Sequence, residues 1–404
     1  MTIRPIFSAL LRNRTGAILV VGQIALTLAI VVNAVFIIQQ RLEHIGRATG
    51  MDVNNIVSTR VQGFGNEYDH LATVREDLAM LNALPGVVAS AAMESVPLSG
   101  SGSANGFRDS DGEEPNSEVA NYYRVSEGVM ETLGVTLYAG RMFSPEEVNW
   151  RSTEEQNGGF MPSVAVISKD MAEALYETPD VVGRMIYNNL GQGAQIIGVI
   201  DRMMGSWVNW PNVMQVVLLP EVPERSWTRY AIRVEPGKAD EMVPVIEEAL
   251  ENRDVQRVVN ATRTMQNMAE HAYSRDNAVA VILMIVVVLL FIVAGLGIVG
   301  LASFTVNQRT KQIGTRRAIG ARKRDIISYF MTENWLLTSI GVAIGSILAV
   351  ALNIWLSDAF GLERLNYWYV PAGIAALWLL GLLAAAGPAR RASNISPAVA
   401  TRTV

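Results

Sequence analysis

The 404-residue sequence contains no cysteine and only three histidines. Without cysteine the chain can form no disulfide, thiolate nucleophile or cysteine-ligated metal site. His44, His70 and His271 are scattered along the chain, and none has metal-ligand spacing such as that of H-E-x-x-H. We therefore expect no metal site and interpret the three histidines as surface polar residues.

Two further enzyme motifs are missing. The pattern G-x-x-x-x-G-K-[S/T] does not occur, so the chain cannot bind and hydrolyse ATP through a P-loop of its own. The serine- and glycine-rich stretch 99–106 does not match the G-x-S-x-G nucleophile elbow between a strand and a helix. The sequence therefore predicts a non-catalytic chain with no cofactor of its own.

Charged residues are also scarce, at 18% of the chain, whereas half of all residues are hydrophobic and mean hydropathy is +0.24. Four long apolar runs stand out, at 15–38, 278–304, 338–355 and 370–389. A bilayer core of roughly 30 Å needs about 20 helical residues, which predicts four transmembrane helices. The first run is too long for a signal peptide and no small-x-small cleavage site follows it, so we interpret it as an uncleaved span.

The basic residues near the ends of these runs predict the orientation. The N-terminal segment, the stretch 309–325 and the C-terminal tail contain thirteen basic residues and one acid, Asp325. Basic residues concentrate on the cytoplasmic side of membrane proteins. We therefore expect both termini and the 305–325 loop to be cytoplasmic, and residues 40–276 to lie outside.

Between the first two spans, residues 54–262 alternate patterns typical of short strands and helices. Strands are predicted at 55–62, 87–96, 119–125, 164–168, 194–200, 214–219, 229–234 and 255–261, helices at 67–84 and 238–252, and a polar loop at 97–117. The fold class that follows is an α-helical membrane protein with four transmembrane helices and an α+β extracytoplasmic domain inserted between helices 1 and 2. Residues 39–50 and 262–277 read as helical continuations of the first two spans, and would form a stalk.

Small and polar residues inside the spans indicate helix packing. The run 295–300 matches the dinucleotide fingerprint G-x-G-x-x-G, but it lies in mid-membrane rather than between a strand and a helix. Close approach of helices explains it better. The glycines assigned to helix packing are Gly295, Gly297, Gly300, Gly341 and Gly345. Gln23 and Asn33 are expected to make hydrogen bonds between helices.

The stretch "RTKQIGTRRAIGARKRD", residues 309–325, packs seven basic side chains between two spans. It has no aromatic residue for base stacking and is too short for a nucleic-acid-binding domain, so we expect no nucleic-acid partner. Contact with anionic lipid headgroups, worth roughly 1 kcal/mol per cation, fits any such run. Lipid contact does not require the glycines of the pattern, however, and docking onto a protein is the preferred interpretation.

Residues 309–337 resemble the signature of ABC-transporter permeases of the MacB and FtsX group, the type VII family. The matching positions are Lys311, Ile313, Gly314, Arg317, Ala318, Ile319, Gly320, Ala321, Lys323 and Ile326, with Glu333 at the later acidic position. Gln312 departs from the pattern, which has glutamate there. The stretches 134–143 and 387–402 are similar to further family motifs, and the order of one span, an outer domain and three spans is also the family's.

The resemblance implies a permease that relays ATP-driven motion of separate ATPase subunits to its outer domain, for export or extrusion of a substrate. It implies a bacterial cytoplasmic (inner) membrane location, with ATP and Mg²⁺ held by the ATPase partner. A second permease subunit is a further implied partner, a periplasmic adaptor protein is allowed, and membrane lipid surrounds the spans. The ATPase-docking residues would be Arg309, Lys311, Gln312, Gly314, Arg316, Arg317, Ala318, Gly320, Arg322 and Lys323. One short helix would carry the cations Arg316, Arg317, Arg322 and Lys323. Gly314 and Gly320 would permit tight turns.

The predicted organisation has six segments. They are a cytoplasmic amphipathic segment (1–14), helix 1 with its stalk (15–47), the outer domain (48–262), the second stalk with helix 2 (263–304), the coupling segment (305–332), and helices 3 and 4 with the tail (333–404). Two alternatives remain open from the residues alone. One is that the chain is a membrane-anchored sensor or signalling protein. The other is that it is an FtsX-like activator of cell-wall hydrolases.

Overall fold

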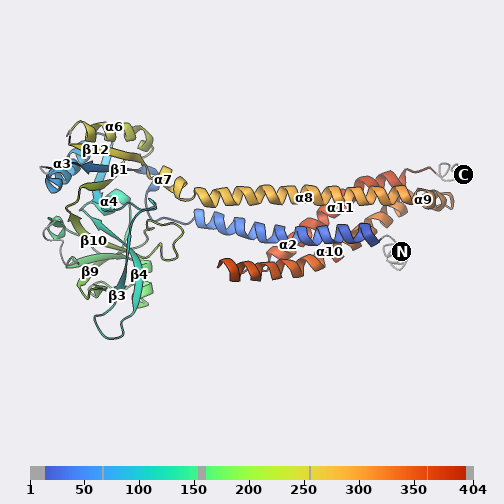
Figure 1. The fold of residues 1–404 in the computed structure, drawn as a ribbon, viewed down its shortest axis with the longest axis horizontal. Coiled ribbons are helices and arrows are strands. Elements are labelled where there is room, and N and C mark those ends of the chain that lie inside the picture. The colour runs from blue at the N-terminus through green and yellow to red at the C-terminus, as the bar shows by residue number, and fades with distance from the viewer. Residues whose placement is uncertain (1–13, 66–67, 153–160, 254–255, 362, 397–404) are drawn as a thin grey trace. The chain divides into compact units, whose positions relative to one another are not determined.

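The computed structural model describes residues 14–65, 68–152, 161–253, 256–361 and 363–396 (Figure 1). These residues fall into two compact units. One combines Met1–Gly46 with Arg275–Val404, and the other is the inserted segment Arg47–Ser274. The predicted amphipathic segment before residue 14 and the tail after residue 396 lie outside the described residues.

The first unit is helical and contains, in the described residues, four helices long and apolar enough to cross a membrane. They are α2 (Arg14–Ile45), α8 (Ser274–Gln308), α10 (Lys323–Phe360) and α11 (Tyr369–Ser393). The four predicted spans are therefore confirmed. Each helix is longer than its apolar run, and α10 continues without a break from the basic stretch into the third span.

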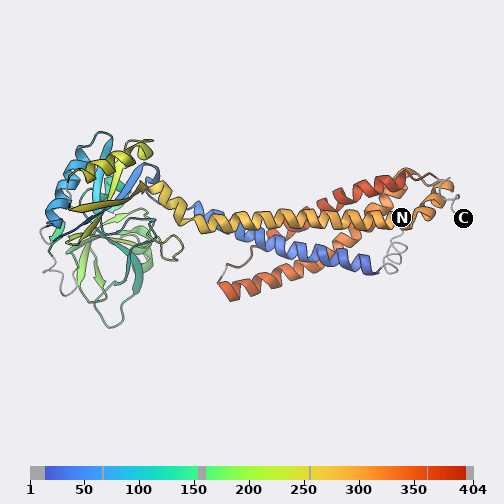
Figure 2. The ribbon, with the colours of Figure 1, turned by 45° about the horizontal axis from the view of Figure 1, so that its top comes forward.

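Helix α2 packs against both α10 and α11, and their apolar side chains form the core of this unit (Figures 1 and 2). A Cβ added at Gly345 of α10 would meet the carbonyl oxygen of Ala25 at 2.8 Å and the Cβ of Leu28 at 2.9 Å. At Gly341 it would meet Ile24 at 2.7 Å. Both glycines therefore let α10 approach α2 closely.

The glycines of α8 differ from one another. A Cβ at Gly297 would clash with the Gln23 side chain of α2. Gln23 Nε2 also donates a hydrogen bond to the Val293 carbonyl at 2.8 Å. Gly295 has only Leu380 nearby, at 3.7 Å, and a Cβ at Gly300 would have no heavy atom within 4 Å. Close helix packing, expected at all three positions, is thus observed at Gly297 and not at Gly300 in this chain.

The second unit is an α+β domain, as predicted, inserted between the first and second membrane helices. Its helices are α3 (His70–Ala83), α4 (Val129–Leu133), α5 (Lys169–Tyr176), α6 (Ala239–Glu251) and α7 (Met265–Ala272). The strands are β1 (Ile56–Gly63), β2 (Val87–Met93), β3 (Ser103–Arg108), β4 (Ser117–Val125), β5 (Leu137–Gly140), β6 (Asn149–Arg151), β7 (Val164–Ser168), β8 (Met185–Asn188), β9 (Gly193–Ile200), β10 (Val216–Pro223), β11 (Trp227–Val234) and β12 (Arg257–Thr264).

These strands join in the order β12-β1-β11-β2-β4-β3-β8-β9-β7-β10-β6, with β5 paired to β9 and β4 paired also to β10. Strand β1 pairs antiparallel with β11 and β12, while β10 runs parallel to β4 and β7 runs parallel to β9. Helices α3 and α6 contribute to one apolar core with β1, β11 and β12, and α5 contributes to a second core with β7 and β9. The inserted unit thus has a substantial core of its own.

A buried ionic cluster supports the first of these cores. Arg257 Nη1 lies 3.0 and 2.9 Å from the two carboxylate oxygens of Asp77, which is fully buried. The Tyr230 hydroxyl donates to Asp77 at 2.8 Å. His70 is 5% exposed, with Nε2 2.9 Å from the Thr228 hydroxyl, so the prediction of a surface histidine is wrong there.

Three further expectations are corrected. Strand β3 lies within the predicted polar loop 97–117 and pairs with β4 and β8. The second stalk is not one helix, because β12 extends to Thr264 and α7 ends at Ala272, with Tyr273 between α7 and α8. Since α7 packs on β1 and β12, the inserted domain extends to Ser274 rather than to residue 262. The first stalk continues α2 as one helix to Ile45, whereas residues 46–50, predicted as part of it, are not helical.

Candidate functional site

The basic stretch 309–325 forms a corner between two helices. Helix α9 (Thr310–Ala318) follows the end of α8, and α10 begins at Lys323 after a short turn. Gly320 in that turn has a φ of +103°, a backbone conformation that favours glycine. Gly314, expected at a turn, lies buried inside α9. The predicted single helix carrying all four cations is wrong, since the chain turns between Arg317 and Arg322.

The inner face of this corner is apolar. Ile313 of α9 is 4% exposed and packs with Ile326 and Phe330 of α10. Val306 at the end of α8 and Ala389 and Ala392 of α11 complete the cluster. One small core therefore joins the ends of α8, α9, α10 and α11, so that these elements hold a fixed relation to one another.

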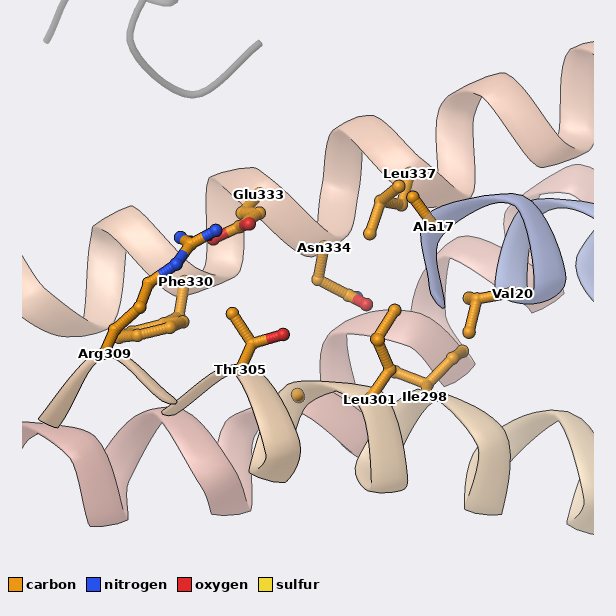
Figure 3. Close-up of a pocket in the computed structure, with 11 residues that line it drawn as sticks. Ala17, Val20, Ile298, Leu301, Thr305, Arg309, Phe330, Glu333, Asn334 and Leu337 are labelled. Atoms are coloured by element: carbon orange, nitrogen blue, oxygen red, sulfur yellow. Dashed lines mark hydrogen bonds and ion pairs between the residues drawn. The ribbon is translucent and has the colours of Figure 1, made fainter. Parts of the chain in front are cut away.

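An ion pair lies in the wall of a cavity beside this core (Figure 3). Arg309 Nη1 is 3.0 Å from Glu333 Oε2 and 3.2 Å from the Tyr329 hydroxyl. The Glu333 side chain is 8% exposed and that of Arg309 is 17% exposed. The cavity, of about 40 Å³, lies between α2, α8 and α10 and is mostly apolar, with Thr305 and Asn334 as further polar members. Arg309 is thus a residue of the internal framework rather than of an outer surface.

Two more of the predicted docking cations also have partners within the chain. Arg317 Nη1 donates to the carbonyl oxygens of Ser393 and Ile395, at 2.9 and 3.0 Å, at the end of α11. These are carbonyls at a helix C-terminus, where a cation is favoured by the helix dipole. Lys323 Nζ donates to Asn394 Oδ1 at 2.8 Å. The hydrogen bonds of Arg317 therefore connect α9 to the end of α11, a structural role that was not predicted from the sequence.

The outer face of the corner exposes the remaining predicted residues. Ile319, at the turn, is 82% exposed. The Arg316 guanidinium lies over the Tyr329 ring, 5.1 Å from its centroid. A hollow of about 340 Å³ opens beside these groups, lined by Arg316, Ile319, Ala321, Asp325, Ile326 and Tyr329. The exposed members of the predicted docking set are Lys311, Gln312, Arg316, Ala318, Gly320, Arg322 and Lys323.

An exposed isoleucine beside the Arg316 cation suits a protein partner that has an apolar pocket with an acid at its rim. Ile319 belongs to the quoted motif but was not among the predicted docking residues. Tyr329 was also missed. Its position on the face of α10 that looks toward α9 follows from helical spacing, but its contact with Arg316 depends on how the corner turns.

Two family models match the sequence, and together they cover most of it. The MacB-like periplasmic core domain matches residues 15–251, more than half of the chain, and the FtsX-like permease C-terminal domain matches residues 284–397. The chain belongs to the MacB/FtsX family of ABC-transporter permeases. The second match contains the whole α9–α10 corner, so the corner is part of the shared permease domain.

Relatives with names include larger proteins and one of similar size. The macrolide export ATP-binding/permease protein MacB of Chromobacterium violaceum is 26% identical over 292 residues, which cover 69% of this permease and 42% of that protein. The uncharacterized ABC transporter permease YknZ of Bacillus subtilis is 24% identical over 287 residues, covering 69% and 68%. The chain thus matches less than half the length of the first of these relatives.

Among solved structures, the periplasmic region of MacB from Actinobacillus actinomycetemcomitans aligns with 57% of this permease and 97% of that chain, at 13% identity and a TM-score of 0.34. The extracellular domain of YknZ aligns with 50% of this permease and all of that chain, at 14% identity and a TM-score of 0.31. The family assignment rests on the sequence matches.

Proposed function

We propose that this permease relays ATP-driven motion of separate ATPase subunits to its α+β domain, and so drives export or extrusion of a substrate. The ATPase would bind ATP and Mg²⁺ and dock on the α9–α10 corner. Motion of the corner would pass along the membrane helices to the inserted domain. A second permease subunit would complete the complex, and a periplasmic adaptor protein is compatible with this arrangement.

The observation that carries this proposal is the construction of the corner. Its inner face is fixed by an apolar core, by the Arg309–Glu333 ion pair and by the contacts of Arg317 with the end of α11. Its outer face presents Ile319 and several cations. A rigid element with an exposed apolar tip is suited to receive force from a partner, because it moves as a body instead of deforming.

The orientation that we propose places the corner in the cytoplasm and the α+β domain on the outer side of the inner membrane. It is supported by the basic residues at the corner and by Arg390 and Arg391 in the last turn of α11. Both termini would then be cytoplasmic. An ATPase requires the nucleotide pool of the cytoplasm, which agrees with docking at this end.

The test is ATP hydrolysis by the complex purified from its native host with the associated ATPase subunit. We expect Arg316→Glu to abolish stimulation of hydrolysis by the permease while leaving membrane insertion intact. Arg364→Glu, the same charge change in the exposed loop between α10 and α11, is the matched control and should retain stimulation. Full stimulation in Arg316→Glu, or failure of any ATPase to co-purify, would contradict the proposal and favour a sensor or a hydrolase activator.

A further inference from the structure

Helix α8 is the least buried of the four membrane helices, so its polar contacts with α2 contribute to how firmly it is held away from the α9–α10 corner. One contact is the hydrogen bond from Gln23, in the first third of α2, to the Val293 carbonyl near the middle of α8. A second lies where α2 ends and α8 begins, at Asp276. Figures 1 and 2 show α2 and α8 side by side over this part of their length.

Asp276 is a buried carboxylate with two partners on α2. It is 3% exposed and lies in the first turn of α8, where the helix dipole favours a negative charge. Arg41 Nη1 is 3.0 Å from Oδ1, and His44 Nδ1 is 3.2 Å from Oδ2. Because Arg41 and His44 are three positions apart on α2, they lie on the same face of the helix. Each of the two contacts a different oxygen of the Asp276 carboxylate. We call these three residues the Asp276 clamp.

The place of this clamp along the chain gives it a special role. His44 lies two residues before Gly46, the last residue of the helical unit before the inserted domain. Asp276 lies two residues after Ser274, the last residue of that domain. Both covalent connections to the α+β domain therefore start next to the clamp. A displacement of α2 or α8 that reaches the domain through the covalent connections therefore passes beside these residues.

The same end of α2 is fastened to the rest of the helical unit. Gln40 Nε2 donates to Glu363 in the α10–α11 loop at 3.0 Å, and Asn353 Oδ1 of α10 accepts from the Leu365 amide at 2.9 Å. The clamp thus adds α8 to a set of polar contacts that already joins α2 to the α10–α11 loop. A buried carboxylate left without its cation would be strongly destabilised, so the clamp resists separation of the helices.

We infer that Asp276 is a positioning residue that holds α2 and α8 together as a single mount for the α+β domain. With the clamp closed, the two connections move together. With it open, α8 can move while α2 stays, and motion of the α9–α10 corner is no longer passed on as one displacement. The relay part of this inference rests on the proposed function, whereas the mount itself does not.

The absence of cysteine makes the test direct, because introduced cysteines are the only sites for spin labels. Labels at Leu42→Cys and Asn277→Cys, both exposed, report the separation of α2 and α8 at the clamp in the full chain in lipid nanodiscs. Labels at Leu19→Cys and Leu296→Cys, also exposed, report it away from the clamp. The measurement is the distance distribution of each pair by pulsed electron paramagnetic resonance.

We expect Asp276→Asn to at least double the width of the 42–277 distribution and to leave the 19–296 distribution unchanged. Arg41→Gln should broaden the first pair in the same way, whereas Arg41→Lys, which keeps the charge, should restore most of the narrow distribution. Arg41→Gln also provides the test if Asp276→Asn does not fold. An unchanged 42–277 distribution in the folded variants overturns the assignment, and so does equal broadening of both pairs.

Measurements on the complex with the ATPase test this inference and the proposed function independently of each other. Asp276→Asn leaves the α9–α10 corner intact, so stimulated ATP hydrolysis should persist while the 42–277 distribution stays broad with and without ATP. Absence of stimulation in the unaltered permease would refute the proposed relay and leave the label measurements as the test of the mount. If the Asp276→Asn variant lost stimulation while the unaltered permease kept it, the statement that the clamp does not affect ATPase docking would be wrong.

Discussion

Neighbouring arginines at the α9–α10 corner should have opposite effects when they are changed. Arg317 Nη1 donates two hydrogen bonds to carbonyls at the end of α11, at 2.9 and 3.0 Å. Arg316 lies over the Tyr329 ring with its side chain exposed. We therefore expect Arg317 to contribute to the stability of the helical unit and Arg316 to contribute to binding of the ATPase.

The magnitudes follow from these contacts. Hydrogen bonds from a charged donor contribute about 1.5–3 kcal/mol, and a cation at a helix C-terminus adds about 0.3–1 kcal/mol. Arg317→Gln should therefore cost about 2–3 kcal/mol, a fall in Tm of about 5–10 °C for a unit of this size. Arg316→Glu loses a cation–π contact of about 0.5–1 kcal/mol, which changes Tm by only a few degrees.

Binding should show the reverse order. Charge reversal at Arg316 replaces an attraction of about 1 kcal/mol at 4 Å in water by a similar repulsion, which corresponds to roughly thirtyfold weaker binding. Thermal unfolding in detergent and the affinity for the purified ATPase are the two assays. The reasoning is refuted if Arg317→Gln weakens ATPase binding at unchanged Tm, or if Arg316→Glu lowers Tm by 5 °C or more and leaves binding intact.

Three further predictions concern packing and charge. Arg257→Met should cost the α+β domain about 3–5 kcal/mol in chemical denaturation, because the buried Asp77 would keep only the more distant Arg253, at 3.7 Å, as a cationic partner. A loss below about 1 kcal/mol would be incompatible with a buried pair. Burial lowers the pKa of His70 from 6.5 to about 4. Between these pH values the His70 imidazole is therefore protonated in the unfolded chain and neutral in the folded one. The contribution of His70 to stability should therefore be constant above pH 6.5 and fall by about 3 kcal/mol as the pH drops to 4. His70→Gln should reduce the pH dependence of stability by that amount, and an unchanged slope would contradict the assignment. Gly345→Ala should cost about 1–3 kcal/mol in thermal unfolding because α2 lies within 2.8 Å of the new Cβ, whereas Gly300→Ala should cost nothing, and equal effects would argue against the α2–α10 contact.

The sequence predicts the spans well because a bilayer imposes a length and an apolarity that four runs satisfy. It predicts β1 equally well, since Val57 and Val61 are buried on a strand with alternating residue types. Strand β3 is different. Its only large apolar residue is Phe107, and its place in the sheet is fixed by pairing with β4 and β8, which periodicity cannot show.

The corner shows the same limit at single residues. Arg316 and Arg317 are indistinguishable in a basic run, but successive helical residues point about 100° apart, so only one of them reaches the end of α11. Gly314 and Gly320 look alike in the motif, yet only Gly320 has a positive φ. Whether α7 continues into α8 depended on whether its residues would pack on the domain, a tertiary effect that helix propensity does not contain.

The central claim is that the α9–α10 corner docks onto an ATPase subunit, and a single cysteine tests it most directly. Ile319→Cys would be the only cysteine of the chain, and it lies at the exposed tip of the corner. A photo-crosslinker attached there and activated in native membranes should yield one main adduct with an ATP-binding subunit, which mass spectrometry identifies, and the adduct should disappear in Arg316→Glu. Labelling of lipid alone, or of proteins that bind no nucleotide, would contradict the account.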